Sequence, residues 1–241
     1  VWAELFRIPY KQMPLDENYR LKIDDYKGEN GGIVFPNPNA PTGIYESLEH
    51  IEEIIKNNPD VIVIVDEAYI DFGGETALPL IDKYDNLVVV RTFSKSRSMA
   101  GLRIGYAISN PELIKALNDV KYSYNSYTMN RPSLVLGVES IRDEAYFREK
   151  VGQIIATRER FVKEIAELGF TCLPSSANFV FATHESIPAK EIFAAAKENN
   201  IYVRYFDKPR IDNYLRISIG TDAEMDAFVA FLKGYIETKQ N

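Results

Sequence analysis

Lys95 stands just after an apolar, β-branched run, in the stretch Asn-Leu-Val-Val-Val-Arg-Thr-Phe-Ser-Lys. Arg103 lies eight residues further along, inside a second apolar stretch, Leu-Arg-Ile-Gly-Tyr-Ala-Ile. A lysine at the end of a buried strand is either a solvated loop residue or a nucleophile held in a pocket, where its amine can form a Schiff base with a carbonyl compound. The groups that lie beside it decide between the two.

Two other apolar runs also end in residues unlike their neighbours. Gly-Gly-Ile-Val-Phe (31–35) leads into the turn Pro-Asn-Pro-Asn-Ala-Pro-Thr-Gly, which contains Asn39, and Val-Ile-Val-Ile-Val (61–65) leads into Asp66 and Tyr69. Taken singly, each has a structural explanation as a turn, a helix cap or a surface residue. Parallel strands, however, end on one edge of a sheet, where ligands bind in open α/β folds. We therefore expect these groups and the lysine to converge on one ligand.

The elements that position these groups follow from the apolar pattern. Runs at 31–35, 61–65 and 87–90 are apolar on both faces, and a segment with helical spacing runs from Ser47, a good N-cap, to Asn57. Such runs separated by helices predict a parallel sheet that is covered on two sides.

The second half of the chain has a different texture. A short helix (111–120), a tyrosine-rich link (121–131) and a further helix lead into a long amphipathic helix from Asp143 to Leu168. Three later strands, Asn-Phe-Val-Phe, Ile-Tyr-Val-Arg and Leu-Arg-Ile-Ser, alternate with helical segments and predict a small sheet backed by two helices. The pattern indicates two domains, residues 1–140 and residues 141–241.

Composition narrows the class of protein. The chain has 241 residues, 46% of them hydrophobic, which is enough for a sizeable core, and no apolar run approaches the roughly 20 residues that span a bilayer. A net charge of −7 argues against broad nucleic-acid binding. Cys172 is the single cysteine, so a reducing, cytoplasmic location is expected. His50 and His184 lack metal-ligand spacing, so both are expected at the surface and no metal is expected. Because the chain begins at Val1 in amphipathic material, we expect a fragment lacking its natural N-terminus.

The candidate groups match the needs of one cofactor. An amine can form a Schiff base with the aldehyde of pyridoxal phosphate, and a carboxylate can pair with its protonated pyridine nitrogen. Hydroxyl groups and an arginine can hold its phosphate.

The motifs also resemble those of a known family. The order Asn-x-Pro-Thr-Gly, Asp-x-x-Tyr and Ser-Lys with an arginine eight residues on resembles the fold-type I pyridoxal-phosphate aminotransferases, over essentially the whole chain. Within that superfamily, Arg-Thr-Phe-Ser-Lys-Ser-Arg-Ser-Met-Ala-Gly-Leu-Arg-Ile-Gly and Tyr-Leu-Arg-Ile-Ser-Ile-Gly-Thr are most similar to histidinol-phosphate aminotransferases. The resemblance implies an α/β fold: part of a large domain with a three-layer, mostly parallel sheet, and a smaller C-terminal α+β domain.

The resemblance also implies roles for single residues. Lys95 matches the lysine that forms the internal aldimine and shuttles the proton, Asp66 the aspartate paired with the pyridine nitrogen, and Tyr69 the tyrosine that donates to the phenolic oxygen of the cofactor. The implied phosphate contacts are Ser94, Arg103 and, as a weaker match, Thr92. The implied substrate contacts are Arg216, for a carboxylate, and Arg204, for the other anionic end.

One position departs from the family pattern. Relatives carry an asparagine directly before Pro-Thr-Gly, where this chain has Ala40. Either Asn39 contacts the phenolic oxygen through a shifted turn, or Asn39 is a structural turn residue and Tyr69 holds the oxygen alone. For the arginines, a salt-bridged or rim position is the ordinary alternative to ligand binding.

The implied reaction is transamination between L-histidinol phosphate and 2-oxoglutarate, an amino donor and a 2-oxo acid. The resemblance further implies a homodimer at full length, and a glycine-rich phosphate turn, a stacking aromatic ring and a partner tyrosine that precede this sequence. The alternatives are an aromatic or broad-specificity aminotransferase, a phosphothreonine decarboxylase, a regulator with an aminotransferase-like domain, and a catalytically inactive homologue.

Overall fold

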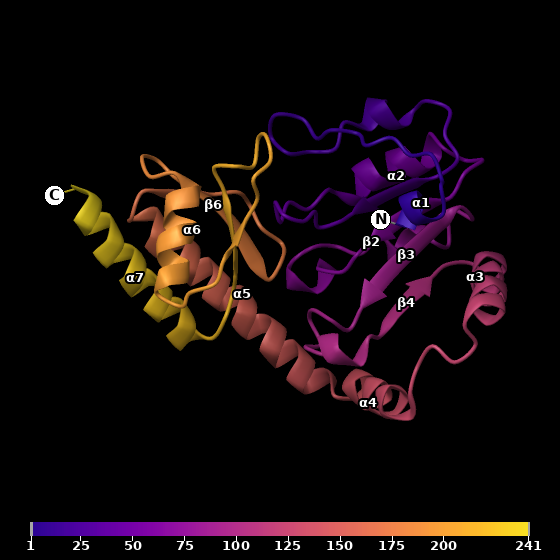
Figure 1. Ribbon diagram of the computed structural model, residues 1–241. Coiled ribbons are helices and arrows are strands. Elements are labelled where there is room, and N and C mark those ends of the chain that lie inside the picture. Colours follow the sequence, from indigo (N-terminus) through magenta and orange to yellow (C-terminus); the bar gives the residue numbers. More distant parts are fainter. Residues whose placement is uncertain (1, 241) are drawn as a thin grey trace.

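The computed structural model describes residues 2–240 and contains two lobes, each with its own four-stranded sheet (Figure 1). The sheet of the first lobe is ordered β1-β2-β3-β4. Its strands are β1 (Ile33–Pro36), β2 (Val63–Asp66), β3 (Leu87–Thr92) and β4 (Gly105–Ile108). The first three strands are parallel, as their apolar runs predict, while β4 returns antiparallel to β3.

The packing of α2 (Leu48–Lys56) shows how the local sequence determines the structure of the first lobe. The Ser47 side chain caps the helix by accepting a hydrogen bond from the backbone N–H of His50 at 3.4 Å, as predicted. Ile51, Ile54 and Ile55 then share one helix face and are fully buried against the sheet. This face fixes the register of the sheet, because a slip by one residue would turn the apolar side chains of each strand away from it.

The opposite face of the sheet differs from the prediction of strands that are covered on both sides. β1 alternates between buried and exposed residues, and Val34 retains 68% of its accessible surface. Ile62, just before β2, is 40% exposed. Among the residues that the structure describes, therefore, this face is covered only in part, and the run of apolar residues alone could not reveal that.

The second lobe has a sheet ordered β5-β6-β8-β7 in which every pairing is antiparallel. Its strands are β5 (Phe170–Cys172), β6 (Phe179–His184), β7 (Arg204–Tyr205) and β8 (Leu215–Ser218). The helices α6 (Ala189–Glu198) and α7 (Asp222–Gln240) pack on it as predicted. The sequence did not predict β5. β7 is only two residues long, because the other residues of Ile-Tyr-Val-Arg-Tyr-Phe do not pair with β8.

Three consecutive helices lead from one lobe to the other: α3 (Pro111–Tyr124), α4 (Arg131–Arg142) and α5 (Glu144–Ala166). The expected end of the first of these at residue 120 is wrong, because the helix continues through part of the tyrosine-rich link. α5 carries Phe161 and Ile165 into the core of the second lobe. Short elements complete the fold: α1 (Trp2–Leu5), η1 (Ile23–Tyr26), η2 (Ile70–Phe72), η3 (Leu78–Leu80) and η4 (Ala100–Leu102).

Arg158 joins the two lobes from α5. Its Nη1 donates to the carbonyl of Phe72, in the first lobe, at 2.9 Å and to the carbonyl of Ala177, in the second lobe, at 2.8 Å. Its side chain is buried, and this burial lowers its pKa below the ordinary arginine value. A second junction lies where the Tyr19 hydroxyl donates to the carbonyl of Arg210 at 2.6 Å. Two separate segments of the first lobe are thus tied to the second lobe.

The prediction that His184 lies at the surface is wrong. It is 6% exposed and packs edge-on against Phe170. Its Nδ1 accepts hydrogen bonds from the backbone N–H groups of Ser186 and Ile187, so the proton sits on Nε2, which donates to the carbonyl of Leu168 at 2.9 Å. This histidine therefore organises a turn. His50 is half exposed beside Glu46, as expected. Within residues 2–240, no helix is long and apolar enough to cross a membrane.

Candidate active site

Asp66 is the last residue of β2, and it lies opposite Pro36 of β1 and Val90 of β3. Its Oδ1 accepts a hydrogen bond from the backbone N–H of Ala68 at 3.0 Å, which turns the chain out of the strand. This turn brings Tyr69 to the same edge of the sheet. The sequence Asp-Glu-Ala-Tyr thus places a carboxylate and a phenol side by side at the carboxyl end of a central strand.

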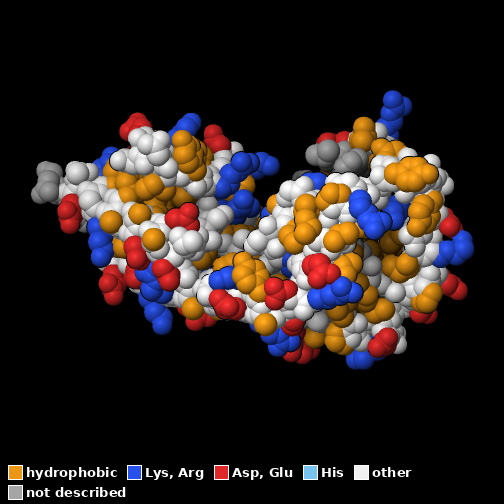
Figure 2. Space-filling model, turned by 90° about the horizontal axis from the view of Figure 1, so that it is seen from below, with side chains coloured by type: hydrophobic (Ala, Val, Ile, Leu, Met, Phe, Trp, Pro, Cys, Tyr) orange, Lys and Arg blue, Asp and Glu red, His pale blue; other side chains and the backbone are white. Residues whose placement is uncertain are grey.

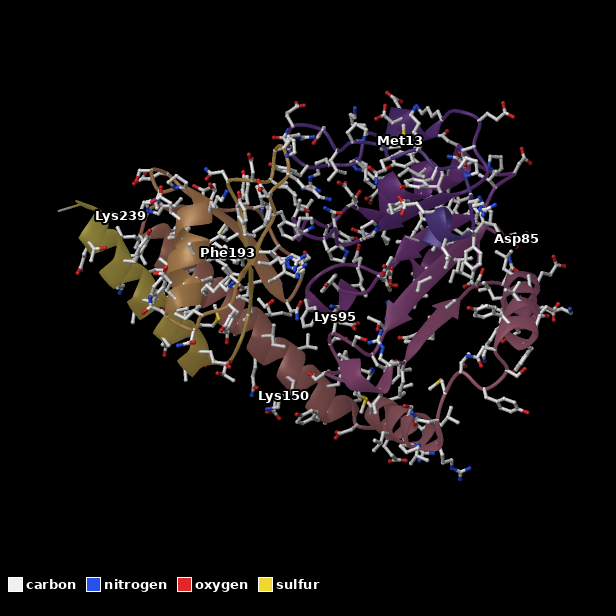
Figure 3. All side chains as sticks on the ribbon, viewed as in Figure 1. Met13, Asp85, Lys95, Lys150, Phe193 and Lys239 are labelled. Carbon is white, nitrogen blue, oxygen red and sulfur yellow. The ribbon has the colours of Figure 1, made fainter. Side chains whose placement is uncertain are left out.

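Lys95 follows β3 on the same edge, and its side chain lies half-buried against Tyr69. The distance from Nζ to the centroid of the tyrosine ring is 5.1 Å. Figure 3 shows Lys95 beyond the strand end, on the side of the first lobe that faces the second. The structure therefore brings Lys95 against Tyr69 and places Asp66 on the same edge of the sheet, as sequence reasoning expected of one ligand site.

The other expected cofactor contacts are less converged. The Thr92 hydroxyl donates to the carbonyl of Ile104 at 3.3 Å and accepts from the backbone N–H of Ser94 at 3.0 Å, so it shapes the turn before the lysine. Ser94 itself is half-buried. Arg103 has a left-handed backbone (φ 56°), is exposed, and donates from Nη1 to the carbonyl of Ala100 at 2.8 Å.

Asn39 stabilises its own turn. Its Nδ2 donates to the hydroxyl of Thr42 at 2.8 Å, and its backbone closes the turn through Gly43 and Ile44. The neighbouring Asn37, which sequence reasoning missed, is fully buried and exchanges two hydrogen bonds with the backbone of Glu46. The geometry of Asn39 supports the structural alternative without testing a cofactor contact.

Arg204 and Arg216 lie directly opposite each other on β7 and β8. The Cζ of Arg216 lies 5.2 Å from the ring centroid of Phe179 and 5.9 Å from that of Phe206, and the Cζ of Arg204 lies 5.5 Å from the same Phe206 ring. Two guanidinium groups thus share one aromatic platform. Within residues 2–240 no ion pair joins either arginine to a carboxylate, and the buried Nε of Arg216 has no hydrogen-bond partner.

Phe179 connects the two halves of the site. Its ring packs edge-on against Tyr69, with the ring centroids 5.2 Å apart, and it also lies under Arg216. Contacts therefore run without a break from Lys95 through the two aromatic rings to the arginine of the second lobe. Figure 2 shows the surface hollowed between the lobes, with basic side chains on the rim of the second lobe. Sequence reasoning missed Phe179, because an apolar residue in an apolar strand carries no separate signal.

These residues fit pyridoxal phosphate. The donor set offers an amine for an aldehyde, a carboxylate for a protonated ring nitrogen and a phenol, and the orphaned Nε of Arg216 calls for an acceptor such as an anion. Among the described residues, no cluster of His, Cys, Asp or Glu could hold a metal ion.

Comparison with known proteins agrees with this geometry. The family model described as aminotransferase class I and II matches residues 2–232. The chain belongs to this family. It is 51% identical over 240 residues to the histidinol-phosphate aminotransferase of Lactococcus lactis subsp. cremoris (strain SK11), covering 100% of this chain and 67% of the relative. It is 49% identical over 236 residues to that of Clostridium botulinum (strain 657 / Type Ba4), covering 98% of this chain and 67% of the relative. The chain thus spans about two thirds of the length of these relatives.

Solved structures of this family superpose closely. The histidinol-phosphate aminotransferase from Clostridium acetobutylicum gives a TM-score of 0.90 at 25% identity, covering 98% of this chain and 74% of that one. The Sinorhizobium meliloti enzyme, solved in complex with pyridoxal-5'-phosphate, gives 0.83 at 25% identity, covering 95% and 64%. The expected fold class, a partial pyridoxal-phosphate-dependent transferase large domain with a smaller domain, is confirmed. So are the expected cofactor and the enzyme class, a pyridoxal-phosphate-dependent aminotransferase.

Proposed function

We propose that a protein of the relatives' length containing this aminotransferase chain transfers the amino group of L-histidinol phosphate to 2-oxoglutarate. The products are imidazole acetol phosphate and glutamate, and the reaction belongs to histidine biosynthesis. The observation that carries the proposal is the pair Arg204 and Arg216, opposed on adjacent strands without a carboxylate partner in the described chain. One substrate carries a phosphate and the other carboxylates, and a guanidinium binds either group in a bidentate manner. The names of relatives that are about half identical support the same substrate.

The roles proposed for the first lobe follow from its chemistry. When bound, pyridoxal phosphate supplies an aldehyde that captures amino groups and a ring that stabilises negative charge on the substrate α-carbon. Lys95 holds the cofactor through its amine and then carries the proton to and from that carbon. Asp66 keeps the ring nitrogen protonated, and Tyr69 donates to the phenolic oxygen.

The remaining cofactor contacts are also proposals. Ser94 and Arg103 bind the phosphate, with Thr92 beside them. Arg103 must turn from its exposed position to do so, and its present bond to the carbonyl of Ala100 is a weak restraint because it is exposed to water. Asn39 reaches the phenolic oxygen only if the second N–H of its Nδ2 faces the cofactor while the first stays on Thr42.

In the second lobe, we assign Arg216 to an anionic group of each substrate, the phosphate of the amino donor in one half-reaction and a carboxylate of 2-oxoglutarate in the other. We assign Arg204 to the distal anion. Residues 1–140 form the cofactor-binding domain and residues 141–241 the small domain. The assembly is a homodimer in the cytoplasm.

Two experiments test the proposal. Borohydride reduction of the holoenzyme followed by peptide mapping should place a pyridoxyl group on Lys95, and a label on another lysine overturns the roles above. Turnover should then be compared on histidinol phosphate, phenylalanine and phosphothreonine. A clear preference for histidinol phosphate is expected. A preference for phenylalanine would identify an aromatic aminotransferase, and carbon dioxide released from phosphothreonine a decarboxylase.

A further inference from the structure

Glu67, directly after Asp66, is a fully buried carboxylate whose hydrogen-bonding capacity is used within the protein. Its Oε2 accepts from Nε and Nη2 of Arg91, at 3.0 and 2.8 Å, and from the hydroxyl of Thr76 at 2.8 Å. Its Oε1 accepts from the backbone N–H of Ala77 at 2.6 Å. Burial alone would lower the pKa of Arg91, but the adjacent Glu67 outweighs it and raises that pKa above the ordinary arginine value.

Asp71 connects Arg91 to the loop that carries Lys95. The Nη1 of Arg91 lies 3.7 Å from Asp71 Oδ1, and Asp71 Oδ2 accepts a hydrogen bond of 2.5 Å from the hydroxyl of Ser96. Ser96 is 5% exposed and directly follows Lys95. A single relay, Glu67–Arg91–Asp71–Ser96, therefore runs from the neighbour of one site residue to the neighbour of another.

The relay matters because Lys95 has few restraints of its own. Its amine contacts the ring of Tyr69, and its carbonyl accepts from the N–H of Ser98 at 3.0 Å, a bond within the same loop. Arg97 ties the loop to α4 through the carbonyl of Ser140, away from the strand ends. The hydrogen bond from Ser96 to Asp71 fastens the loop to η2, directly beside Tyr69.

We propose that Asp71 and Ser96 are positioning residues that hold Lys95 at its reacting distance from the cofactor aldehyde. The inference rests on the proposed role of Lys95, but not on the identity of the amino donor. Its physical basis is that a small misplacement of a reacting group lowers a rate steeply while leaving substrate binding largely unchanged. A relay that only stabilised the fold would affect the melting temperature and leave the reactivity of Lys95 intact.

The test measures the reactivity of Lys95 without any amino donor. Apoenzyme of the relatives' length is mixed with pyridoxal phosphate, and the covalent bond to Lys95, formed as the amine displaces the aldehyde oxygen as water, is followed by absorbance. Ser96→Ala should slow this attachment about tenfold and lower kcat by a similar factor, with KM unchanged within about twofold. Ser96→Thr keeps the hydroxyl and should restore both rates. Ser98→Ala, an exposed serine in the same loop, is the matched control and should behave as wild type.

A mutant cycle gives a second, independent measurement. Asp71→Ala should show at least the loss seen in Ser96→Ala, since it also removes the carboxylate beside Arg91. The double variant should show no loss beyond that of Asp71→Ala, because the Ser96–Asp71 contact is already absent in it. Attachment at the wild-type rate in Ser96→Ala overturns the inference. So does a loss that matches a fall in melting temperature and is not recovered by Ser96→Thr. If wild type attaches the cofactor at Lys95 but prefers another amino donor, the proposed function fails and this inference stands.

Discussion

The two lobes treat their charged residues in opposite ways. At the strand ends of the first lobe, Glu67, Arg91 and Asp71 neutralise one another inside the protein. On adjacent strands of the second lobe, Arg204 and Arg216 stand opposite each other over aromatic rings, and within residues 2–240 neither forms an ion pair with a carboxylate.

The difference distinguishes a framework, meaning charged residues that hold the fold in place, from charged residues that can bind a ligand. A buried charge is strongly unfavourable unless it is paired and hydrogen-bonded, so a complete internal network indicates a structural purpose. Two neighbouring like charges repel, and an anion bound between them relieves the repulsion. We therefore interpret the paired residues Glu67, Arg91 and Asp71 as positioning the site, and Arg204 and Arg216 as binding the ligand. Four predictions follow that comparison, from the largest expected effect to the smallest.

Asp66→Asn should have the largest effect, because Asp66 is the residue proposed to pair with the ring nitrogen of the cofactor. An amide cannot keep the ring nitrogen protonated, so kcat should fall by about 10²-fold to 10³-fold while cofactor binding persists. Steady-state kinetics with a cofactor titration checks this. Near-normal kcat with tight cofactor binding would remove Asp66 from the reaction.

Glu67→Ala should destabilise the protein by about 3–5 kcal/mol, because it leaves Arg91 buried without its main partner. Urea unfolding at constant pH measures the free energy, and Glu17→Ala, at an exposed carboxylate, is the control. A loss no larger than in the control would mean that the network is not a framework.

Arg216→Ala should lower kcat/KM by about 30-fold, equivalent to about 2 kcal/mol, for both substrates. Arg204→Ala should have a smaller effect, concentrated on the phosphorylated amino donor. Neither substitution should lower the melting temperature, since within residues 2–240 neither arginine forms an ion pair with a carboxylate. A clear fall in melting temperature for both would place these arginines with the framework.

The smallest expected effect is a pH dependence of the stability of the fold, which arises from Cys172 in the second lobe. Burial raises the pKa of its thiol to about 12. The neutral thiol is therefore favoured in the folded state, so its stabilisation is complete below the unfolded pKa of about 8.5 and is lost as pH rises from there toward 12. A thiol reagent at pH 8 should react slowly with native protein and rapidly in urea. Cys172→Ala should flatten the alkaline loss of stability, and fast reaction of the native thiol would contradict this.

Local sequence patterns predicted several elements because their causes are local. Ser47 predicted the start of α2, and the apolar runs predicted the three parallel strands. Asp66, Tyr69 and Lys95 could be grouped in advance because parallel strands end on one edge, which makes order along the chain a guide to position. The short β7 and the extension of α3 were not predictable in this way, since element ends depend on neighbours distant in sequence.

The sequence by itself thus determined the family, the parallel sheet and the placement of Asp66 and Lys95 at the strand ends, because each is encoded in residue types at short, ordered spacings. Only the tertiary structure decided which charges are paired. Arg91 and Arg216 are both arginines in strands, yet one meets a carboxylate at 2.8 Å and the other leaves its Nε without a partner. Burial of His184 was decided in the same way, by its packing against Phe170 and its bond to the carbonyl of Leu168. Pairing and burial arise from contacts between distant segments, and no single stretch of sequence contains them.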